Sequence, residues 1–193
     1  MVNLAIFASG SGSNAENIAD YFLDSKQIHV SLIVTNNQNA GVIDRAVRLG
    51  IPVVVFSKQD FFAASKVIDI LHEYQIDHIV LAGFLLLVPE KLILAFLGKI
   101  INIHPALLPH HGGKGFYGNK VHEHVIASKS PISGITIHHV NEKFDEGEII
   151  FQAACCVDKN DSPLDLANKI HQLEYSYFPV VIEKTILSPL ISR

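Results

Sequence analysis

The chain has 193 residues, of which 49% are hydrophobic, and this suits a globular protein with a sizeable core. A formal net charge of −4 and the lack of a run rich in lysine and arginine argue against a nucleic-acid-binding protein, and the longest apolar stretch is too short to span a bilayer. Met1–Ala8 has no basic segment before its apolar residues, so we interpret it as a first strand, not a targeting signal, and expect a cytoplasmic protein.

Along the first half of the chain, short apolar runs alternate with segments of helical spacing. The predicted strands are Leu4–Ala8, Val30–Thr35, Val53–Phe56, Ile79–Ala82 and Ile100–Ile103. The predicted helices are Asn14–Leu23, Val42–Leu49, Lys58–Tyr74 and Pro89–Phe96. Because the strands are continuously apolar, we expect a parallel sheet that is covered on both faces.

The pattern changes in the second half of the chain. Ser133–Val140 and Ile149–Val157 are predicted to form two strands around the turn-like segment Asn141–Gly147. Ser162 is a suitable N-cap, and Pro163 at the first helical position opens a long C-terminal helix. The sequence therefore predicts an α/β protein with a doubly wound, mostly parallel sheet, followed by a β-hairpin and a long helix. No linker interrupts it, so we expect a single domain over 1–193.

A glycine-rich loop follows the first predicted strand. Gly10-Ser11-Gly12-Ser13-Asn14 lets the backbone approach a ligand closely, and the start of the next helix offers free N–H groups to an anion. A dinucleotide fingerprint would need an acid at the end of the second strand, where this chain has Asn36-Asn37. A single phosphate is the favoured guest, and a tight turn without any ligand is the alternative.

Asn102 and His104 stand two residues apart where a buried strand should end. Side chains at i and i+2 of a strand point to the same side, so this amide and imidazole can act on one spot. Such a pair is suited to holding an oxyanion and moving a proton. The alternative is a simple strand end before the loop that begins at Pro105.

Other polar residues are harder to interpret from position alone. Asp145 could pair with His104 and raise the pKa of its ring, but an acid in a polar turn is more often solvated. Glu174 is predicted to be an exposed charge in the middle of a helix. Of the eleven histidines, neighbours on a strand or two apart on a helix should point to different sides. These pairs are His138 with His139 and His122 with His124. The adjacent Cys155 and Cys156 suit neither a mutual bridge nor a zinc site, so no metal is expected.

Several segments, in this order, resemble the folate-dependent phosphoribosylglycinamide formyltransferase family over essentially the whole chain. They are Gly10–Asn14, Leu81-Ala82-Gly83-Phe84, Asn102-Ile103-His104-Pro105-Ala106-Leu107-Leu108-Pro109, Asp145-Glu146-Gly147 and His171-Gln172-Leu173-Glu174-Tyr175. The resemblance implies the formyltransferase fold, with a Rossmann-like N-terminal half. It implies formyl transfer from 10-formyltetrahydrofolate, as co-substrate, to the amine of 5-phosphoribosylglycinamide in purine biosynthesis.

The resemblance also implies roles for individual positions. The catalytic residues would be Asn102, His104 and Asp145, with Asp145 keeping His104 cationic. The phosphate and ribosyl group would contact Gly12, Ser13, Asn14, His171, Gln172, Leu173 and Glu174. Folate would contact Leu85, Leu86, Leu87, Val88, Asn102, His138, Asn141, Glu142, Lys143, Phe144 and Asp145. Residues 1–103 would form the phosphate-binding half and residues 104–193 the half that completes and closes the folate site.

The chain departs from the family at Leu86, where many relatives carry a basic residue, and in the longer, glycine-rich segment His110–Gly118. The partners implied are small molecules, without nucleic acid or membrane, for a monomer or homodimer. Three alternatives remain: a formyltetrahydrofolate hydrolase, a formyltransferase acting on initiator tRNA, and a non-catalytic module that binds folate or a nucleotide. The first two typically carry an additional domain, which we do not expect here.

Overall fold

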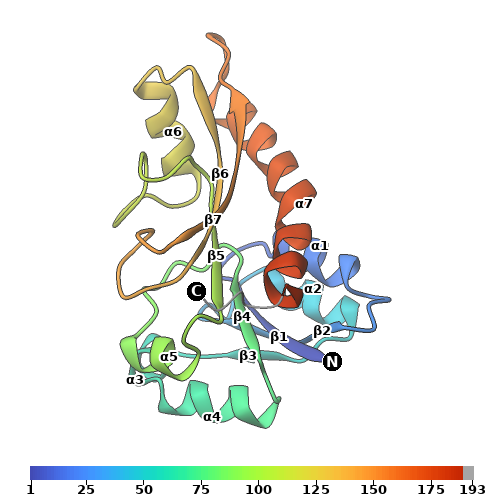
Figure 1. The fold of residues 1–193 in the computed structure, drawn as a ribbon. Coiled ribbons are helices and arrows are strands. Elements are labelled where there is room, and N and C mark those ends of the chain that lie inside the picture. The colour runs from blue at the N-terminus through green and yellow to red at the C-terminus, as the bar shows by residue number, and fades with distance from the viewer. Residues whose placement is uncertain (189–193) are drawn as a thin grey trace.

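A computed structural model describes residues 1–188, which fold around a single seven-stranded sheet of order β3-β2-β1-β4-β5-β6-β7 (Figure 1). The strands are β1 Val2–Phe7, β2 Ile28–Thr35, β3 Val53–Val55, β4 His78–Leu81, β5 Ile100–His104, β6 Ile132–His139 and β7 Ile149–Cys156. Strands β1 to β5 pair in parallel, whereas β6 and β7 are antiparallel to their neighbours. The predicted doubly wound sheet and C-terminal hairpin are thus confirmed.

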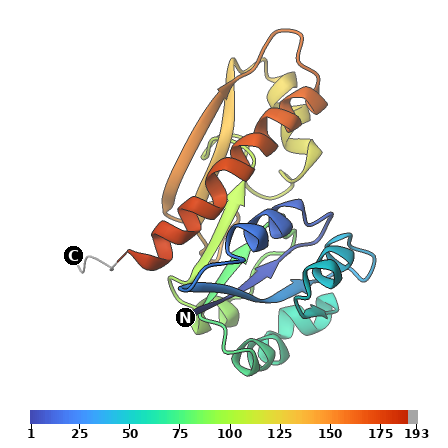
Figure 2. The same cartoon turned by 90° about the vertical axis from the view of Figure 1, so that its right-hand side faces the viewer.

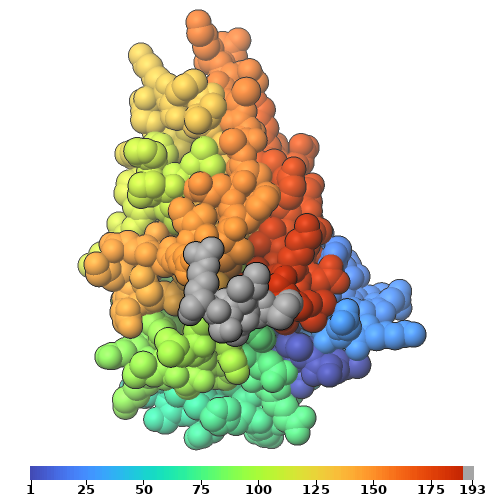
Figure 3. All heavy atoms as spheres, in the orientation of Figure 1, coloured from blue at the N-terminus to red at the C-terminus, as the bar shows by residue number. Residues whose placement is uncertain are grey.

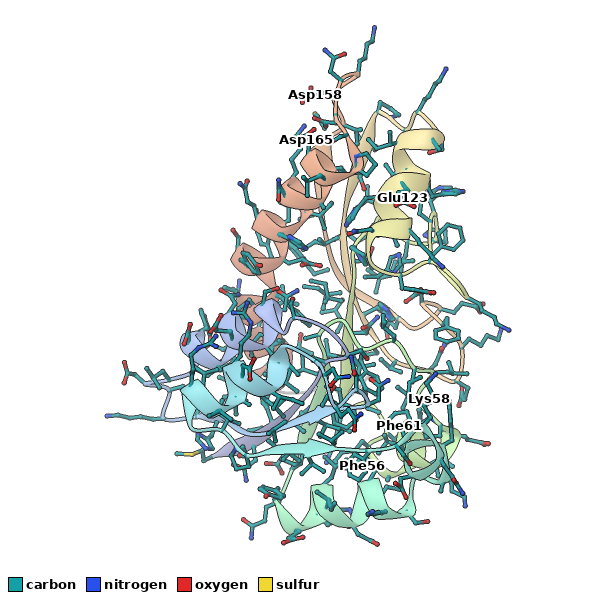
Figure 4. All side chains as sticks on the ribbon, turned by 180° about the vertical axis from the view of Figure 1, so that it is seen from behind. Phe56, Lys58, Phe61, Glu123, Asp158 and Asp165 are labelled. Carbon is teal, nitrogen blue, oxygen red and sulfur yellow. The ribbon has the colours of Figure 1, made fainter. Side chains whose placement is uncertain are left out.

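Helices cover both faces of the sheet. They are α1 Ser13–Tyr21, α2 Val42–Leu49, α3 Lys58–Ala63, α4 Ser65–Glu73, α5 Glu90–Ala95, α6 Asn119–Ala127 and α7 Pro163–Leu187. One buried cluster joins the sheet to α1, α2, α6 and α7, and α7 runs diagonally in front of the strands in Figure 2. A second cluster, which includes Phe56 and Phe61 of Figure 4, joins the opposite face to α3, α4 and α5.

The N-terminal half of the molecule forms a broad base, and α6 with the far end of the β6–β7 hairpin forms a narrower top (Figure 3). No helix in residues 1–188 is both long and apolar enough to cross a membrane. Cys155 and Cys156 both lie on β7 as free thiols, as their adjacent positions predicted.

The prediction of a single helix over Lys58–Tyr74 is wrong, because the structure has two helices there. Ala64 lies between them with φ 63°, in the left-handed region, and its N–H closes α3 on the Asp60 and Phe61 carbonyls. Alanine is the best helix former, so neither propensity nor apolar spacing marks this break. Phe61 and Ala64 are both fully buried at the break.

The long C-terminal helix is confirmed, and its first turn carries a reciprocal capping box. Ser162 accepts from the N–H of Asp165 while the Asp165 carboxylate accepts from the Ser162 N–H. Farther along, Pro179 lies inside the helix and has no N–H for the Tyr175 carbonyl four residues earlier. The Asn17 amide of α1 donates to that carbonyl at 3.1 Å, so the proline also serves to join α7 to α1.

Candidate functional site

A cavity of about 620 Å³ lies at the carboxyl ends of the parallel strands. In doubly wound sheets ligands bind at this edge. Four segments supply most of its lining: Gly10–Asn14, Leu81–Val88, Asn102–Pro105 and Gly113–Asn119. The remaining lining residues are His122, His138, Val140, Asn141, Lys143, Phe144, Asp145, His171 and Glu174.

The glycine-rich loop forms one wall of the cavity. Gly12 stands at the start of α1 with φ 77°, and a Cβ atom there would lie 2.5 Å from a methyl carbon of Val42, so only glycine fits. No side chain caps this end of α1, which leaves the first N–H groups of the helix to accommodate an anion. Ser13 and Asn14 line the cavity beside them.

Glu174 lies under this loop and is buried, with an exposed fraction of 6%, so the prediction of an exposed helical charge is wrong. Helix α7 packs across α1, and the Asn14 Nδ2 atom donates to Glu174 Oε2 at 2.8 Å. Burial raises the pKa of this carboxyl, although the Asn14 hydrogen bond and the nearby His171 oppose the shift.

The segment His171–Glu174 is only partly in the cavity. His171 and Glu174 line it, because residues three apart share a helix face. Gln172 is exposed and Leu173 packs against the apolar core, so neither lies on the cavity wall. Contacts from these two residues to a ligand remain a prediction that the geometry does not favour.

Asn102 and His104 both line the cavity from β5, and β6 places His138 opposite Asn102. The His138 Nδ1 atom lies 2.8 Å from the His139 carbonyl oxygen, which can only accept, so Nδ1 carries the proton. The Nε2 atom is then free to accept from Asn102 Nδ2 at 3.0 Å. This bond orients the Asn102 amide, whose second N–H remains available. Of the two neighbouring histidines, His138 is the one in the cavity.

His104 is 3% exposed, and both of its ring nitrogens face acceptors. Nε2 donates to the His111 carbonyl at 2.9 Å, and Nδ1 lies 3.5 Å from Asp145 Oδ2. Burial lowers the pKa of the ring and outweighs the Asp145 carboxylate and the His111 carbonyl, which raise it. The expectation that Asp145 keeps His104 cationic stays a prediction, which the Asp145 and His111 oxygens favour and burial opposes. His104 therefore lies between two hydrogen-bond acceptors, the His111 carbonyl and the Asp145 carboxylate.

Asp145 is not a solvated turn residue, since 11% of its side chain is exposed. Its backbone has φ 58°, which turns the side chain inward, and Oδ2 accepts from the Gly113 N–H at 2.9 Å. Burial alone would raise the pKa of this carboxyl, but the His138 and His104 rings, in their protonated forms, and the Gly113 N–H together lower it. Asp145 is thus a carboxylate that can stabilise a proton arriving on His104.

An apolar segment, Leu85–Val88, forms another wall of the cavity. Ser9 joins it to the glycine-rich loop, because its hydroxyl accepts from the Leu85 N–H at 3.0 Å and donates to Asn36 at 2.6 Å. In the turn between β6 and β7, Asn141, Lys143 and Phe144 also line the cavity. Glu142 is exposed and does not.

A buried network secures the turn that follows His104. Thr136 stands opposite His104 in the sheet, and its hydroxyl donates to the Ala106 carbonyl at 2.7 Å while accepting from the Leu108 N–H at 2.9 Å. Gln152 on β7 donates to the same hydroxyl and to the Leu108 carbonyl. The turn after His104 is consequently tied to both β6 and β7.

Sequence reasoning missed His122 as a cavity residue, although it placed His122 and His124 on different helix faces. That prediction is confirmed, since His122 is buried and His124 is exposed. The spacing of Val121 and Val125 marks the buried face of α6 and could have pointed to His122. Residues 113–119 also line the cavity, without a predicted role. Within residues 1–188, no group of three or more histidine, cysteine or acidic side chains is arranged to hold a metal ion.

The sheet and its cavity define an α/β protein that binds ligands beyond the carboxyl ends of parallel strands. Residues 2–182 match the model of the Formyl transferase family, and the chain belongs to that family. Phosphoribosylglycinamide formyltransferase of Bacillus subtilis is 34% identical over 96% of this chain and 95% of its own length. The crystal structure of that enzyme from Bacillus halodurans has a TM-score of 0.87 and 34% identity, covering 96% of each chain.

A plant relative is longer than this chain. The chloroplastic phosphoribosylglycinamide formyltransferase of Arabidopsis thaliana is 44% identical over 93% of the chain, which spans 63% of that protein's length.

Proposed function

We propose that the protein transfers the formyl group of 10-formyltetrahydrofolate to the amine of 5-phosphoribosylglycinamide, a step of purine biosynthesis. The observation that carries this proposal is that one cavity combines a phosphate-type loop, an apolar wall and the Asn102, His104 and Asp145 side chains. Relatives named phosphoribosylglycinamide formyltransferase match nearly the whole chain, which supports the same reaction.

In the proposed reaction the phosphate lies at Gly12–Asn14 and the folate against Leu85–Val88. The substrate amine attacks the formyl carbon, and the carbonyl oxygen becomes an oxyanion that accepts from the free N–H of the Asn102 amide. Neutral His104 takes the proton that the attacking amine loses, with Asp145 stabilising the imidazolium. His104 then returns this proton to the folate N10 atom as its bond to carbon breaks. One oxyanion donor is typically worth about 3 kcal/mol in the transition state.

The His111 carbonyl holds His104 Nε2, so the loop that carries it is part of the same proposal. Proton transfer through Nε2 requires that this contact be replaced by one to the reacting groups. Transfer through Nδ1, which faces Asp145, leaves the contact in place.

We also propose a cytoplasmic protein, a monomer or homodimer that acts on small molecules without nucleic-acid or membrane partners. The formal net charge of −4 and the match to the Bacillus subtilis enzyme over nearly its full length support this view. The Arabidopsis relative carries the description chloroplastic, so location can differ among relatives.

The test is to measure folate deformylation by the purified chain with and without phosphoribosylglycinamide. Formyl transfer predicts that product forms only with this acceptor and that formylated acceptor accumulates in equal amount. His104→Gln should lower kcat by about a hundredfold or more, whereas His72→Gln, an exposed histidine on α4, should not. Turnover without acceptor would instead identify a hydrolase, and folate binding without turnover would identify a binding module.

A further inference from the structure

We propose that His122 hydrogen-bonds a hydroxyl of the ribosyl group and so recognises the middle of the acceptor substrate. The inference rests on the proposed function, because it names a contact within the same cavity. It adds a residue from α6 to the predicted phosphate and catalytic groups.

His122 belongs to the buried face of α6. Its exposed fraction is 3%, and it shares this face with Val121 and Val125 while still lining the cavity. A polar ring on an otherwise apolar helix face loses its contacts with water, so it needs partners from the protein or from a ligand.

One ring nitrogen has no such partner within the described part of the chain. The Nδ1 atom of His122 is buried and accepts or donates no hydrogen bond there. Buried polar atoms are nearly always paired, so an unpaired one in a residue that lines the cavity points to a ligand group or to a water that a ligand retains.

The position of His122 selects the part of the substrate that it can reach. Helix α6 packs against α7, and the two titratable neighbours that act on His122 are His171 and His104. His171 lies on the helix that carries Glu174 to the phosphate loop, and His104 lies with the reacting groups. The acceptor must extend from one to the other, and the ribosyl ring is its middle.

The charge state of His122 selects a hydroxyl and not the phosphate. Burial, followed by the charges of His171 and His104, lowers the pKa of His122 to about 4, so the ring is neutral near pH 7. A neutral imidazole has one donor and one acceptor nitrogen, which matches a hydroxyl group. A phosphate would instead favour the cation, which the surroundings of His122 disfavour.

The experiment compares two variants with two altered substrates. His122→Leu removes the polar group at similar volume, and His122→Asn keeps an amide near the position of Nδ1. KM and kcat are measured with phosphoribosylglycinamide and with its 2′-deoxy and 3′-deoxy analogues. Glu123→Ala, at the exposed neighbouring position labelled in Figure 4, is the matched control.

His122→Leu should raise KM for the ribosyl substrate about tenfold, with little change in KM for folate, and His122→Asn should restore part of the loss. With the wild type, KM for one of the two deoxy analogues should exceed KM for the ribosyl substrate by about the same factor. With His122→Leu these two KM values should be equal, because the substitution and the missing hydroxyl remove the same hydrogen bond. Direct binding of phosphoribosylglycinamide, measured by calorimetry, should weaken in parallel.

The inference would be overturned if KM rose by the same factor for both deoxy analogues, and did so in the wild type and in His122→Leu alike. An unchanged KM for the ribosyl substrate in a folded His122→Leu or His122→Asn variant would also overturn it. If His122→Leu does not fold, the folded His122→Asn variant decides through its own response to the analogues. Failure of the wild type to formylate the acceptor would refute the proposed function. Calorimetry separates this outcome from a failure at His122 alone, because it measures binding of phosphoribosylglycinamide without turnover.

Discussion

Replacing His122 with leucine should make the stability of the protein less sensitive to pH. The ring has a pKa of about 4 in the folded protein, against 6.5 for an unperturbed histidine. Between these values the unfolded chain binds a proton that the folded chain does not. Stability from the neutral ring is therefore complete above pH 6.5 and is lost as the pH falls towards 4.

The size of this effect follows from the two pKa values. A difference between 6.5 and about 4 corresponds to about 3 kcal/mol of unfolding free energy lost between pH 8 and pH 4. This is a large part of the roughly 5–15 kcal/mol that stabilises a typical protein. Other histidines with lowered pKa values, including the buried His104 and the half-buried His78 and His139, act in the same direction and remain present in the variant.

Urea unfolding, followed by circular dichroism from pH 8 down to pH 4, measures the effect. The difference in unfolding free energy between these limits should be about 3 kcal/mol smaller for His122→Leu than for the wild type. Val121→Ala is the matched control, because it removes buried carbon atoms from the same helix face without changing a titratable group. It should cost about 2 kcal/mol at every pH and leave the pH dependence unchanged. Equal pH dependence in His122→Leu and the wild type would refute the reasoning.

Three further substitutions test the cavity. Asn14→Asp places a second carboxylate where Glu174 Oε2 lies 2.8 Å away, so KM for the ribosyl substrate should rise at least about tenfold while KM for folate stays constant. Gly12→Ala should cost about 2 kcal/mol or more in urea unfolding, given φ 77° and the contact with Val42, and a neutral result would contradict the loop geometry. Asp145→Asn should lower kcat about a hundredfold or more in a protein that remains folded, and near-normal turnover would remove Asp145 from the reaction.

Much of the fold could be predicted because it depends on local patterns. The boundaries of α2 match the prediction residue for residue, since an apolar face ends at Gly50, a glycine in the left-handed region. The capping box at Ser162 likewise marks the start of α7. The break at Ala64 could not be predicted, because it depends on how α3 and α4 pack on the sheet, and no local residue type signals it.

Some residues of the candidate site could likewise be predicted from local patterns, whereas others depend on how distant elements pack. Asn102 and His104 could be placed on one side of a strand end, because alternation alone determines it. The burial of Glu174 could not be foreseen, since it depends on α7 crossing α1 far away in the sequence. The pKa of His104 also depends on the packing of the whole chain. A carboxylate neighbour can be guessed from a motif, but the desolvation that outweighs it is a property of the packed cavity.

The antiparallel strand β6 shows most clearly why the site needs the whole fold. Its register places His138 opposite Asn102 and Thr136 opposite His104, so one neighbour orients the amide and the other secures the turn after the imidazole. A slip of one residue would reverse the faces of β6 and turn His139 towards the cavity in place of His138. Gly147 holds this register, because a Cβ atom there would lie 1.6 Å from the His139 carbonyl oxygen, the same atom that fixes the His138 tautomer. The orientation of the Asn102 amide thus depends on a close backbone approach in the turn that also carries Asp145.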